Sequence, residues 1–440
     1  MKVAIHTLGC KVNQYETQAI EALLKEHGHT IVPFDDMADA YVINTCTVTA
    51  VSDRKSRQMI RRAKAKSEHA IVAVCGCYPQ THQAEALALD VDLIMGTNDR
   101  AGFVSRLEAL AAGHAAPRTE VDNAMQRRAF EPLPPGGMEG RTRAMLKVED
   151  GCVNFCTYCI IPYARGPVRS LPLADAAEAA GHLASEGYRE IVLTGIEISS
   201  WGCDLPGKPS LCDLIEAVCT AAPGLRIRLG SLEPRTVTEE FCARLKVLPN
   251  LCPHFHLSLQ SGCDATLARM GRKYDTARYR RSVQLLRNAF GPAAGITTDV
   301  IVGFPGETEE EFSATLDFLT EMGFSALHVF PYSVRPGTPA ARMEGQLTRS
   351  EKEDRARRAG AVARQLKADF LHHLVGQTLP VLFEEEKDGL WQGHAPNYVA
   401  VRADGAQLHN VLLPVEITAV SGDTLLGRIC PPDDRKETLS

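Results

Sequence analysis

Short apolar runs alternate with helical segments in the first part of the chain. The apolar runs cover residues 3–8, 41–44, 71–74 and 92–95. Each is short and aliphatic, which is typical of a strand buried on both faces of a parallel sheet. Between the runs, apolar side chains recur at helical spacing, as at Ile20, Leu23 and Leu24. The alternation predicts an open parallel α/β sheet within residues 1–115.

A second strand and helix alternation begins near Arg143, after a segment at 116–140 that is rich in Pro, Gly and charge and is predicted to be a linker. The expected strands are residues 144–148, 190–194, 225–230, 254–260, 296–303 and 325–330. Six β/α units are two short of a closed (β/α)8 barrel. Residues 141–375 are therefore predicted to form a partial (β/α)6 barrel, with an open side that admits a large substrate.

The pattern changes again near the end of the chain. A charged helical stretch at 350–373 precedes short alternating runs, such as 379–383, 398–402 and 416–420, with Gly and Asn at the turns. This pattern predicts a small antiparallel β-barrel within residues 376–440. The fold class predicted for the whole chain is α/β, with two α/β units followed by this barrel.

Three cysteines follow the first strand of the central unit at short spacing, and we call Cys152, Cys156 and Cys159 the first cysteine trio. Zinc and electron-transfer iron–sulfur sites usually take four protein ligands, so three thiolates leave one metal position open for another molecule. The loop resembles that of the radical S-adenosylmethionine (SAM) enzymes. In that superfamily the open iron of a [4Fe-4S] cluster binds the methionine end of SAM.

A second cysteine trio, Cys10, Cys46 and Cys77, is spread over the amino-terminal unit. Each member lies just past the carboxyl end of a predicted strand, and these ends share one edge of a parallel sheet, where ligands bind. Three thiolates would again leave one iron open. Cys75 is an alternative third ligand, but Cys77 is preferred because it lies in the turn after Gly76 rather than inside the strand.

Composition limits the classes of function. The chain has 440 residues, 14 cysteines and a net charge of -6. With no secretory signal, so many cysteines favour thiol or metal chemistry in a reducing cytoplasm over a disulfide scaffold. The apolar runs are too short for a membrane span, so no membrane partner is expected. The net charge gives no overall indication of a nucleic-acid partner.

Polar and glycine residues at the strand ends of the central unit are candidates for binding SAM, because ligands bind at the carboxyl ends of barrel strands. Backbone groups at Gly195 and Glu197 suit the amino group of SAM, and Ser231 with Glu233 suits ribose hydroxyls. Glycine near the adenine would permit close approach. The full set of candidates is Tyr158, Gly195, Glu197, Ser231, Glu233, Gln260, Gly303 and Phe304.

Taken together, the motifs resemble the methylthiotransferases, which are radical SAM enzymes with an amino-terminal auxiliary-cluster unit and a carboxyl-terminal RNA-binding barrel of the TRAM type. The matching segments are residues 7–16, 44–48, 76–78, the loop of the first trio, 165–166 and 256–262. Residues 9–16, Gly-Cys-Lys-Val-Asn-Gln-Tyr-Glu, resemble the branch acting on N6-threonylcarbamoyladenosine at tRNA position 37. One departure is Cys75, where the family is expected to have threonine.

The resemblance implies the reaction. SAM and two [4Fe-4S] clusters would add a methylthio group to adenine C2, using two SAM molecules, with the second trio holding the cluster that carries the sulfur. The implied partners are a tRNA anticodon stem-loop, an electron donor such as a flavodoxin or ferredoxin, and an unidentified sulfur donor. No general base is identified. The alternatives are methylthiolation of isopentenyladenosine in tRNA, methylthiolation of a ribosomal protein, and a non-catalytic iron–sulfur RNA-binding protein.

Positive charge is concentrated in two runs, at 54–66 and 269–281, while the final barrel is acidic. Each run follows a strand end at the expected active-site mouth, which favours a phosphate-binding surface over a merely solvated face. The candidate nucleic-acid contacts are Arg57, Arg61, Arg62, Arg272 and Lys273. Tyr398 and Trp391 are candidates for stacking on bases, or else belong to the core of the final barrel.

Overall fold

The computed structural model describes residues 1–440 except 68, 116, 135–141 and 432–440, so parts of the predicted linker and of the end of the final barrel lie outside the described residues. The amino-terminal unit is a six-stranded parallel sheet of order β2-β1-β3-β4-β5-β6. Its strands are β1 (Lys2–Thr7), β2 (Thr30–Val32), β3 (Ala40–Thr45), β4 (Ile71–Gly76), β5 (Leu93–Met95) and β6 (Thr119–Glu120). The predicted parallel sheet is confirmed.

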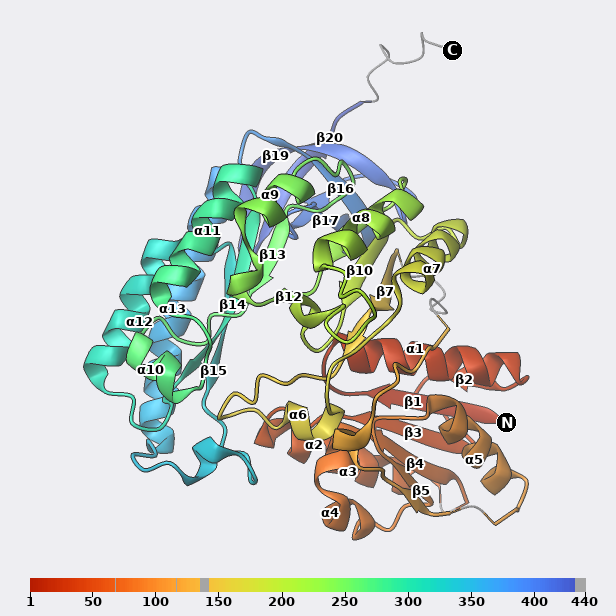
Figure 1. Ribbon diagram of the computed structural model, residues 1–440. Coiled ribbons are helices and arrows are strands. Elements are labelled where there is room, and N and C mark those ends of the chain that lie inside the picture. The colour runs from red at the N-terminus through yellow and green to blue at the C-terminus, as the bar shows by residue number, and fades with distance from the viewer. Residues whose placement is uncertain (68, 116, 135–141, 432–440) are drawn as a thin grey trace.

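Helices cover both faces of this sheet (Figure 1). They are α1 (Lys11–Glu26), α2 (Ala50–Lys64), α3 (Cys77–Thr81), α4 (Gln83–Leu87) and α5 (Arg100–Ala111). The central strand β3 is buried along its whole length, because apolar clusters lie on both of its faces. Helix α1 also packs against the first strand of the next unit, so it lies between the two units.

The central unit is a partial barrel of parallel strands in two sheets, β7-β10-β11 and β12-β13-β14-β15, as predicted. The strands are β7 (Arg143–Lys147), β10 (Glu190–Thr194), β11 (Arg226–Leu229), β12 (Ser231–Leu232), β13 (His254–Leu257), β14 (Gly295–Val302) and β15 (Ala326–Pro331). A two-stranded pair, β8 (Glu149–Asp150) and β9 (Arg169–Ser170), flanks the loop of the first trio. Open edges remain at β7 and β15.

Helices cover the outer face of the partial barrel (Figure 1). They are α7 (Leu173–Ser185), α8 (Leu211–Ala221), α9 (Glu239–Leu245), α10 (Asp264–Arg269), α11 (Thr276–Phe290), α12 (Glu309–Met322) and α13 (Arg349–His373). The short helix α6 (Ile161–Arg165) instead contacts α3 of the amino-terminal unit. The 3-10 turns are η1 (Ala124–Gln126), η2 (Ile198–Ser200), η3 (Pro234–Thr236) and η4 (Pro339–Arg342). The strand residues that face these helices, such as Ile191, Ile227 and Phe255, form the largest apolar core of the molecule. The alternate residues of the same strands therefore face the inside of the barrel.

A closed five-stranded barrel ends the described chain. Its strands are β16 (Thr378–Lys387), β17 (Leu390–His394), β18 (Ala400–Ala403), β19 (Leu412–Ser421) and β20 (Thr424–Ile429). All pairs are antiparallel except β18 with β20, which run parallel. This small barrel packs against the amino-terminal ends of the central strands, through Arg226 and Arg228, whose guanidinium groups donate to carbonyls at His394 and Pro396.

Candidate active site

The loop of the first cysteine trio is shaped by two unusual backbone positions. Gly151 has φ +98, and a Cβ there would lie 2.1 Å from the carbonyl oxygen of Pro167. Phe155 has φ +46, which turns the chain between Cys152 and Cys156. Such conformations cost energy in a non-glycine residue and persist where the surroundings enforce them. The Thr157 N–H donates to the Met270 carbonyl at 2.9 Å, which anchors the loop to the end of α10.

The thiols of the first trio lie close enough to interact electrostatically. Burial raises the pKa of Cys152 and of Cys159 to about 12. The free thiols of Cys152 and Cys159 are therefore protonated at neutral pH, and a metal that binds them must displace their protons. Arg272 donates to the Cys156 sulfur at 3.1 Å, so one cation already faces this trio.

A polar pocket of 250 Å³ lies beside the first trio and brings together residues from three strand ends. Asn154 of the loop, Glu197 and Glu233 line it, together with Ser199 and Arg235. Burial raises the pKa of Glu197 to about 7. Two of the predicted SAM-binding residues, Glu197 and Glu233, thus meet at one pocket next to the cysteines.

Glu149 was not singled out from the sequence. A Cβ on Gly195 would lie 2.7 Å from the Glu149 carboxylate, and the Glu197 N–H donates to that carboxylate at 2.7 Å. The carboxyl group is fully buried, and burial raises its pKa well above the ordinary value. The Glu149 carboxylate therefore accepts the Glu197 N–H, which is one of the backbone groups that the sequence suggested for SAM. Only its place in β8, directly before the loop, could have indicated a role.

The remaining predicted SAM residues lie around the other strand ends. Ser231 is exposed on β12, and Gln260 has φ +70 just after β13. A Cβ on Gly303, φ +70, would meet Lys352 of α13 at 2.5 Å, so the glycine is required by helix packing. Phe304 is fully buried, and its ring lies 6.4 Å from that of Tyr158. The Phe304 ring therefore packs edge-to-face against the Tyr158 ring.

The second cysteine trio lies at the carboxyl ends of three neighbouring strands. Cys10 precedes α1, Cys46 directly follows β3, and Cys77 begins α3 directly after β4. A Cβ on Gly9, φ +111, would lie 3.1 Å from the Cys46 sulfur, so only glycine lets the Cys10 turn approach Cys46 this closely. The Cys77 thiol interacts electrostatically with both Cys46 and Cys10.

Cys75 does not join this trio in the structure. It lies within β4 in the apolar cluster on one face of the sheet, and its electrostatic neighbours are Arg100, Glu16 and Arg165. Strand alternation puts residues 75 and 76 on opposite faces, whereas Cys77 lies beyond the strand end. The geometry therefore favours Cys77 as the third member.

Both trios suit an iron–sulfur cluster better than a single ion. Over the described ranges, no three His, Cys, Asp or Glu side chains are arranged to hold one metal ion. A four-iron cluster is larger than one ion and takes its cysteines farther apart, with thiolates as its usual ligands. Each trio offers thiols alone, just past a strand end, and would leave one iron without a protein ligand.

A buried ion network joins the two trios. Glu16 of α1 pairs with Arg100, 2.9 Å away, with Arg165 and with Lys147, 3.3 Å away, and all four side chains are buried. Arg165, at the end of α6, also donates to the Asn13 amide oxygen at 2.7 Å. Asn13 in turn donates to the Leu8 and Thr45 carbonyls at the turns that carry Cys10 and Cys46. The network fixes one trio relative to the other.

A second contact joins the same units near Cys46. Arg335, which follows β15 and is 2% exposed, donates to Asp53 at 2.5 Å and to Thr47 at 2.7 Å. The Ala50 N–H donates to Ser333 at 3.0 Å. The end of β15 is thereby fixed to the loop after Cys46. Neither bridge was predicted, because its members are far apart in sequence.

The predicted nucleic-acid residues have different environments. On α2, Arg57 pairs with Glu85 at 3.3 Å and Arg62 pairs with Asp35. Arg61 is exposed and makes no ion pair within the described part of the chain. The second basic run is largely paired, in Arg269–Glu311, Arg280–Glu321 and Arg281–Glu239. Arg272 faces Cys156 instead of solvent, and Lys273 is exposed.

The two candidate stacking residues also differ. Trp391 is partly buried against the core of the small barrel. Tyr398 instead contacts the central barrel, where its ring lies 5.0 Å from His254 and 4.6 Å from the guanidinium carbon of Arg228. Its side chain is still 36% exposed.

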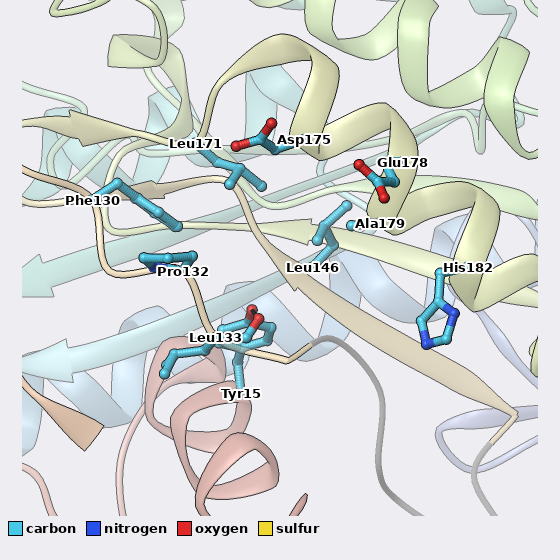
Figure 2. Close-up of a pocket in the computed structure, with 10 residues that line it drawn as sticks. All are labelled: Tyr15, Phe130, Pro132, Leu133, Leu146, Leu171, Asp175, Glu178, Ala179 and His182. Atoms are coloured by element: carbon cyan, nitrogen blue, oxygen red, sulfur yellow. Dashed lines mark hydrogen bonds between the residues drawn. The ribbon is translucent and has the colours of Figure 1, made fainter. Parts of the chain in front are cut away.

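An apolar groove of 350 Å³ lies away from both trios (Figure 2). Tyr15 of α1 and the segment from Phe130 to Leu133 form one side, and Asp175, Glu178 and His182 of α7 form the other. No residue of either trio lines it. Within the described ranges, no helix is both long and apolar enough to cross a membrane.

Comparison with known proteins identifies the two α/β units. Residues 2–96 match the model of "Uncharacterized protein family UPF0004", and residues 146–319 match the radical SAM superfamily. A solved structure, the radical SAM methyltransferase TsrM from Kitasatospora setae, has the same fold over 77% of this chain and 75% of its own, with a TM-score of 0.55 and 17% identity.

Curated relatives match over nearly the whole length. The threonylcarbamoyladenosine tRNA methylthiotransferase MtaB of Bacillus subtilis is 42% identical over 92% of this chain and 91% of its own. MtaB of Thermotoga maritima is 37% identical over 90% of each chain. A tRNA-2-methylthio-N(6)-dimethylallyladenosine synthase of Pelotomaculum thermopropionicum is 31% identical over 95% of each.

These matches establish the kind of enzyme and its cofactors. The protein is a radical SAM enzyme whose cofactors are SAM and two [4Fe-4S] clusters. By its similarity over both α/β units and the small barrel, the chain belongs to the radical SAM methylthiotransferase family, on the branch of the threonylcarbamoyladenosine tRNA methylthiotransferases.

Proposed function

We propose that this enzyme adds a methylthio group to C2 of N6-threonylcarbamoyladenosine at position 37 of tRNA. The observation that carries the proposal is the pair of cysteine trios held in one frame by the buried network around Glu16 and Arg165. Two sites that must act on the same carbon need a fixed separation, and buried charges with several partners provide it.

The first trio would hold the cluster that binds SAM, and the second trio would hold the cluster that carries sulfur. When bound, SAM and the two clusters supply the one-electron cleavage of SAM, hydrogen removal from an unactivated carbon, and the sulfur, with two SAM molecules used per product. The chain itself would bind and orient the cofactors and the substrate, and it would exclude water from them. Glu197 and Glu233 at the polar pocket would take the amino group and the ribose of SAM.

Tyr158 and Gly303 would border the adenine of SAM, with Phe304 holding Tyr158 in position at a ring distance of 6.4 Å. Arg272, 3.1 Å from the Cys156 sulfur, would orient that ligand and offset its negative charge. Its pairing with a cluster ligand favours this role over tRNA binding.

We assign residues 1–115 to the auxiliary-cluster unit, 141–375 to the radical SAM unit and the barrel of β16–β20 to RNA binding, with the anticodon stem-loop as substrate. Exposed cations on α2 support a phosphate-binding role there, since Arg54, Lys55 and Arg61 make no ion pair within the described residues. A flavodoxin or ferredoxin would reduce the first cluster, a separate donor would renew the sulfur, and the enzyme would act in the cytoplasm.

The test is mass spectrometry of nucleosides from tRNA of cells with and without the gene. The expected result is loss of 2-methylthio-N6-threonylcarbamoyladenosine and accumulation of its unmethylthiolated precursor. The purified enzyme should restore the modification in that tRNA. Loss of 2-methylthio-isopentenyladenosine, or of a methylthiolated ribosomal protein, would instead assign the enzyme to another substrate.

A further inference from the structure

The inner surface of the partial barrel is charged at its amino-terminal end. Strand alternation directs Arg143, Glu190, Arg228 and His254 inward, because the residue after each of them lies in the outer apolar core. Arg228 pairs with Glu190 at 2.7 Å, and Arg226 pairs with the same carboxylate at 2.6 Å. Each carboxylate in this layer therefore already has a cationic partner.

The other carboxylates nearby are also occupied. Arg143 pairs at 3.0 Å with Glu384 of β16, which also contacts His394 at 3.0 Å. Asp299 of β14 lies 3.5 Å from His256. Among the described residues, both of these carboxylates therefore already have a partner.

One more cation reaches this layer from the other unit. Lys11 is the first residue of α1 and directly follows Cys10. Its ammonium interacts electrostatically with Tyr398, Arg228, Arg143, Glu190 and His254, so the side chain extends into the barrel. Within the described part of the chain it makes no hydrogen bond or ion pair. Arg143, Arg226 and Arg228 already share the carboxylates of Glu190 and Glu384, so Lys11 adds one further cation that has no carboxylate partner among the described residues.

Parts of the inner surface of the barrel remain exposed and could contact a ligand. The inward residues of β14 and β15 remain partly exposed, while their outward neighbours are buried. His328 and Phe330 are exposed on the inner face of β15, at the open edge of the barrel. Tyr398, at the floor, is 36% exposed although it packs against His254. His254 is 4% exposed, and its Nδ1 has no hydrogen-bond partner. A buried polar atom without a partner calls for a ligand or water.

We propose that Lys11, with His254 and Tyr398 beside it, binds the carboxylate of the threonylcarbamoyl group on the substrate adenosine. This inference rests on the proposed function, because the carboxylate of that group gives the modified base its single negative charge. Lys11 likewise carries one positive charge without a carboxylate partner among the described residues, so the two match. Since Lys11 is adjacent to Cys10, a substrate held there would present its adenine beside the second trio.

The same contact would determine which modified adenosine the enzyme accepts. An isopentenyl group is an uncharged hydrocarbon, and placing it here would leave a largely desolvated ammonium without a partner. A site built to pair a charged group rejects an analogue that lacks it far more strongly than an apolar pocket rejects an extra methylene. Lys11 is therefore assigned as a specificity-determining residue.

The test uses two anticodon stem-loop RNAs, one with N6-threonylcarbamoyladenosine at position 37 and one with the methyl ester of the same carboxylate. The parent enzyme should bind the acid about tenfold more tightly than the ester, as one charge-assisted hydrogen bond predicts. Lys11→Met should bind both equally, through weaker binding of the acid. Lys11→Arg should keep the preference, and Lys246→Met, an exposed lysine after α9, should match the parent.

Iron content is measured on every variant, because Lys11 adjoins Cys10. Equal binding of acid and ester by the parent, or an unchanged preference in Lys11→Met, would overturn the assignment. Failure of the proposed function is a separate result: the parent would then bind the acid RNA without converting it to the 2-methylthio product. A parent that converts the acid RNA and a Lys11→Met variant that keeps its preference would refute the subsite alone.

Discussion

Arg165 and Glu16 form a fully buried ion pair between residues 149 positions apart, one at the end of the helix after the first trio and the other on the helix after Cys10. The Arg165 Nη2 lies 3.2 Å from the second carboxylate oxygen. The pair thus links the segments that follow the two cysteine trios through the protein interior.

Replacing Glu16 by Gln should destabilise the cofactor-free protein by about 3 kcal/mol, because the buried Arg100 would lose its carboxylate partner, and Arg165 and Lys147 would keep only Asp150. Urea denaturation measures this loss. The matched control is Glu85→Gln, which breaks the more exposed pair with Arg57 and should cost less than about 1 kcal/mol. Equal losses in the two variants would show that the buried network stabilises the protein no more than an exposed ion pair does.

Replacing Cys152, Cys156 and Cys159 together by Ala should remove about half of the iron and all cleavage of SAM, because each trio can hold one [4Fe-4S] cluster. Iron analysis after anaerobic reconstitution and assay of 5'-deoxyadenosine give the two readings. Cys212, Cys219 and Cys242 lie in the apolar core and provide a control triple variant, which should keep its full iron content if it folds. Parent protein with iron for only one cluster would refute the second site.

Replacing Cys77 by Ala should abolish methylthiolation and leave reductive cleavage of SAM intact, since only the second trio loses a ligand. Cys75→Ala is the control two residues away, and its effect should be mild because that thiol lies inside β4. Comparing product formation with 5'-deoxyadenosine formation separates the two steps. An inactive Cys75 variant beside an active Cys77 variant would reverse the ligand assignment.

Neutralising Arg54, Lys55 and Arg61 on α2 by Gln should weaken tRNA binding at moderate salt. If each contacts a phosphate, the log–log salt slope should flatten by about two to three units. Arg280→Gln with Arg281→Gln is the control, because both side chains are already paired with carboxylates. A larger effect from the control pair would move the binding surface to α11.

Replacing Arg272 by Gln should make the reduction potential of the first cluster more negative, because a cation 3.1 Å from a cysteine sulfur stabilises the more negative, reduced state. Redox titration followed by electron paramagnetic resonance measures the shift. Arg272→Lys keeps a positive charge and should therefore shift the potential less than Arg272→Gln does. An unchanged potential together with weaker tRNA binding would show that Arg272 contacts the nucleic acid, as the basic run around it suggested.

Local features of the chain predicted much of the fold. Strands β3 and β4 are short aliphatic runs, and Cys46 and Cys77 follow them directly, so the sheet and the convergence at its edge could be inferred from the sequence. The ion pairing of the basic runs could not be inferred from the sequence. The carboxylates that pair with Arg269 and Arg280 belong to α12, which is distant in sequence. The same holds for Lys11, whose surroundings exist only once α1 meets the partial barrel.

The contact between the small barrel and the partial barrel bears on the synthesis of the protein. Arg228 is completely buried, and it donates to the Pro396 carbonyl at 2.7 Å and the Ala395 carbonyl at 3.4 Å, from the loop between β17 and β18. During translation the strands of the central unit leave the ribosome well before that loop exists. Until it arrives, the inner arginines remain hydrated and the floor of the barrel stays open. A chain terminated near residue 375 would therefore be an incomplete fold exposed to proteolysis, not a smaller enzyme that lacks only an RNA-binding part.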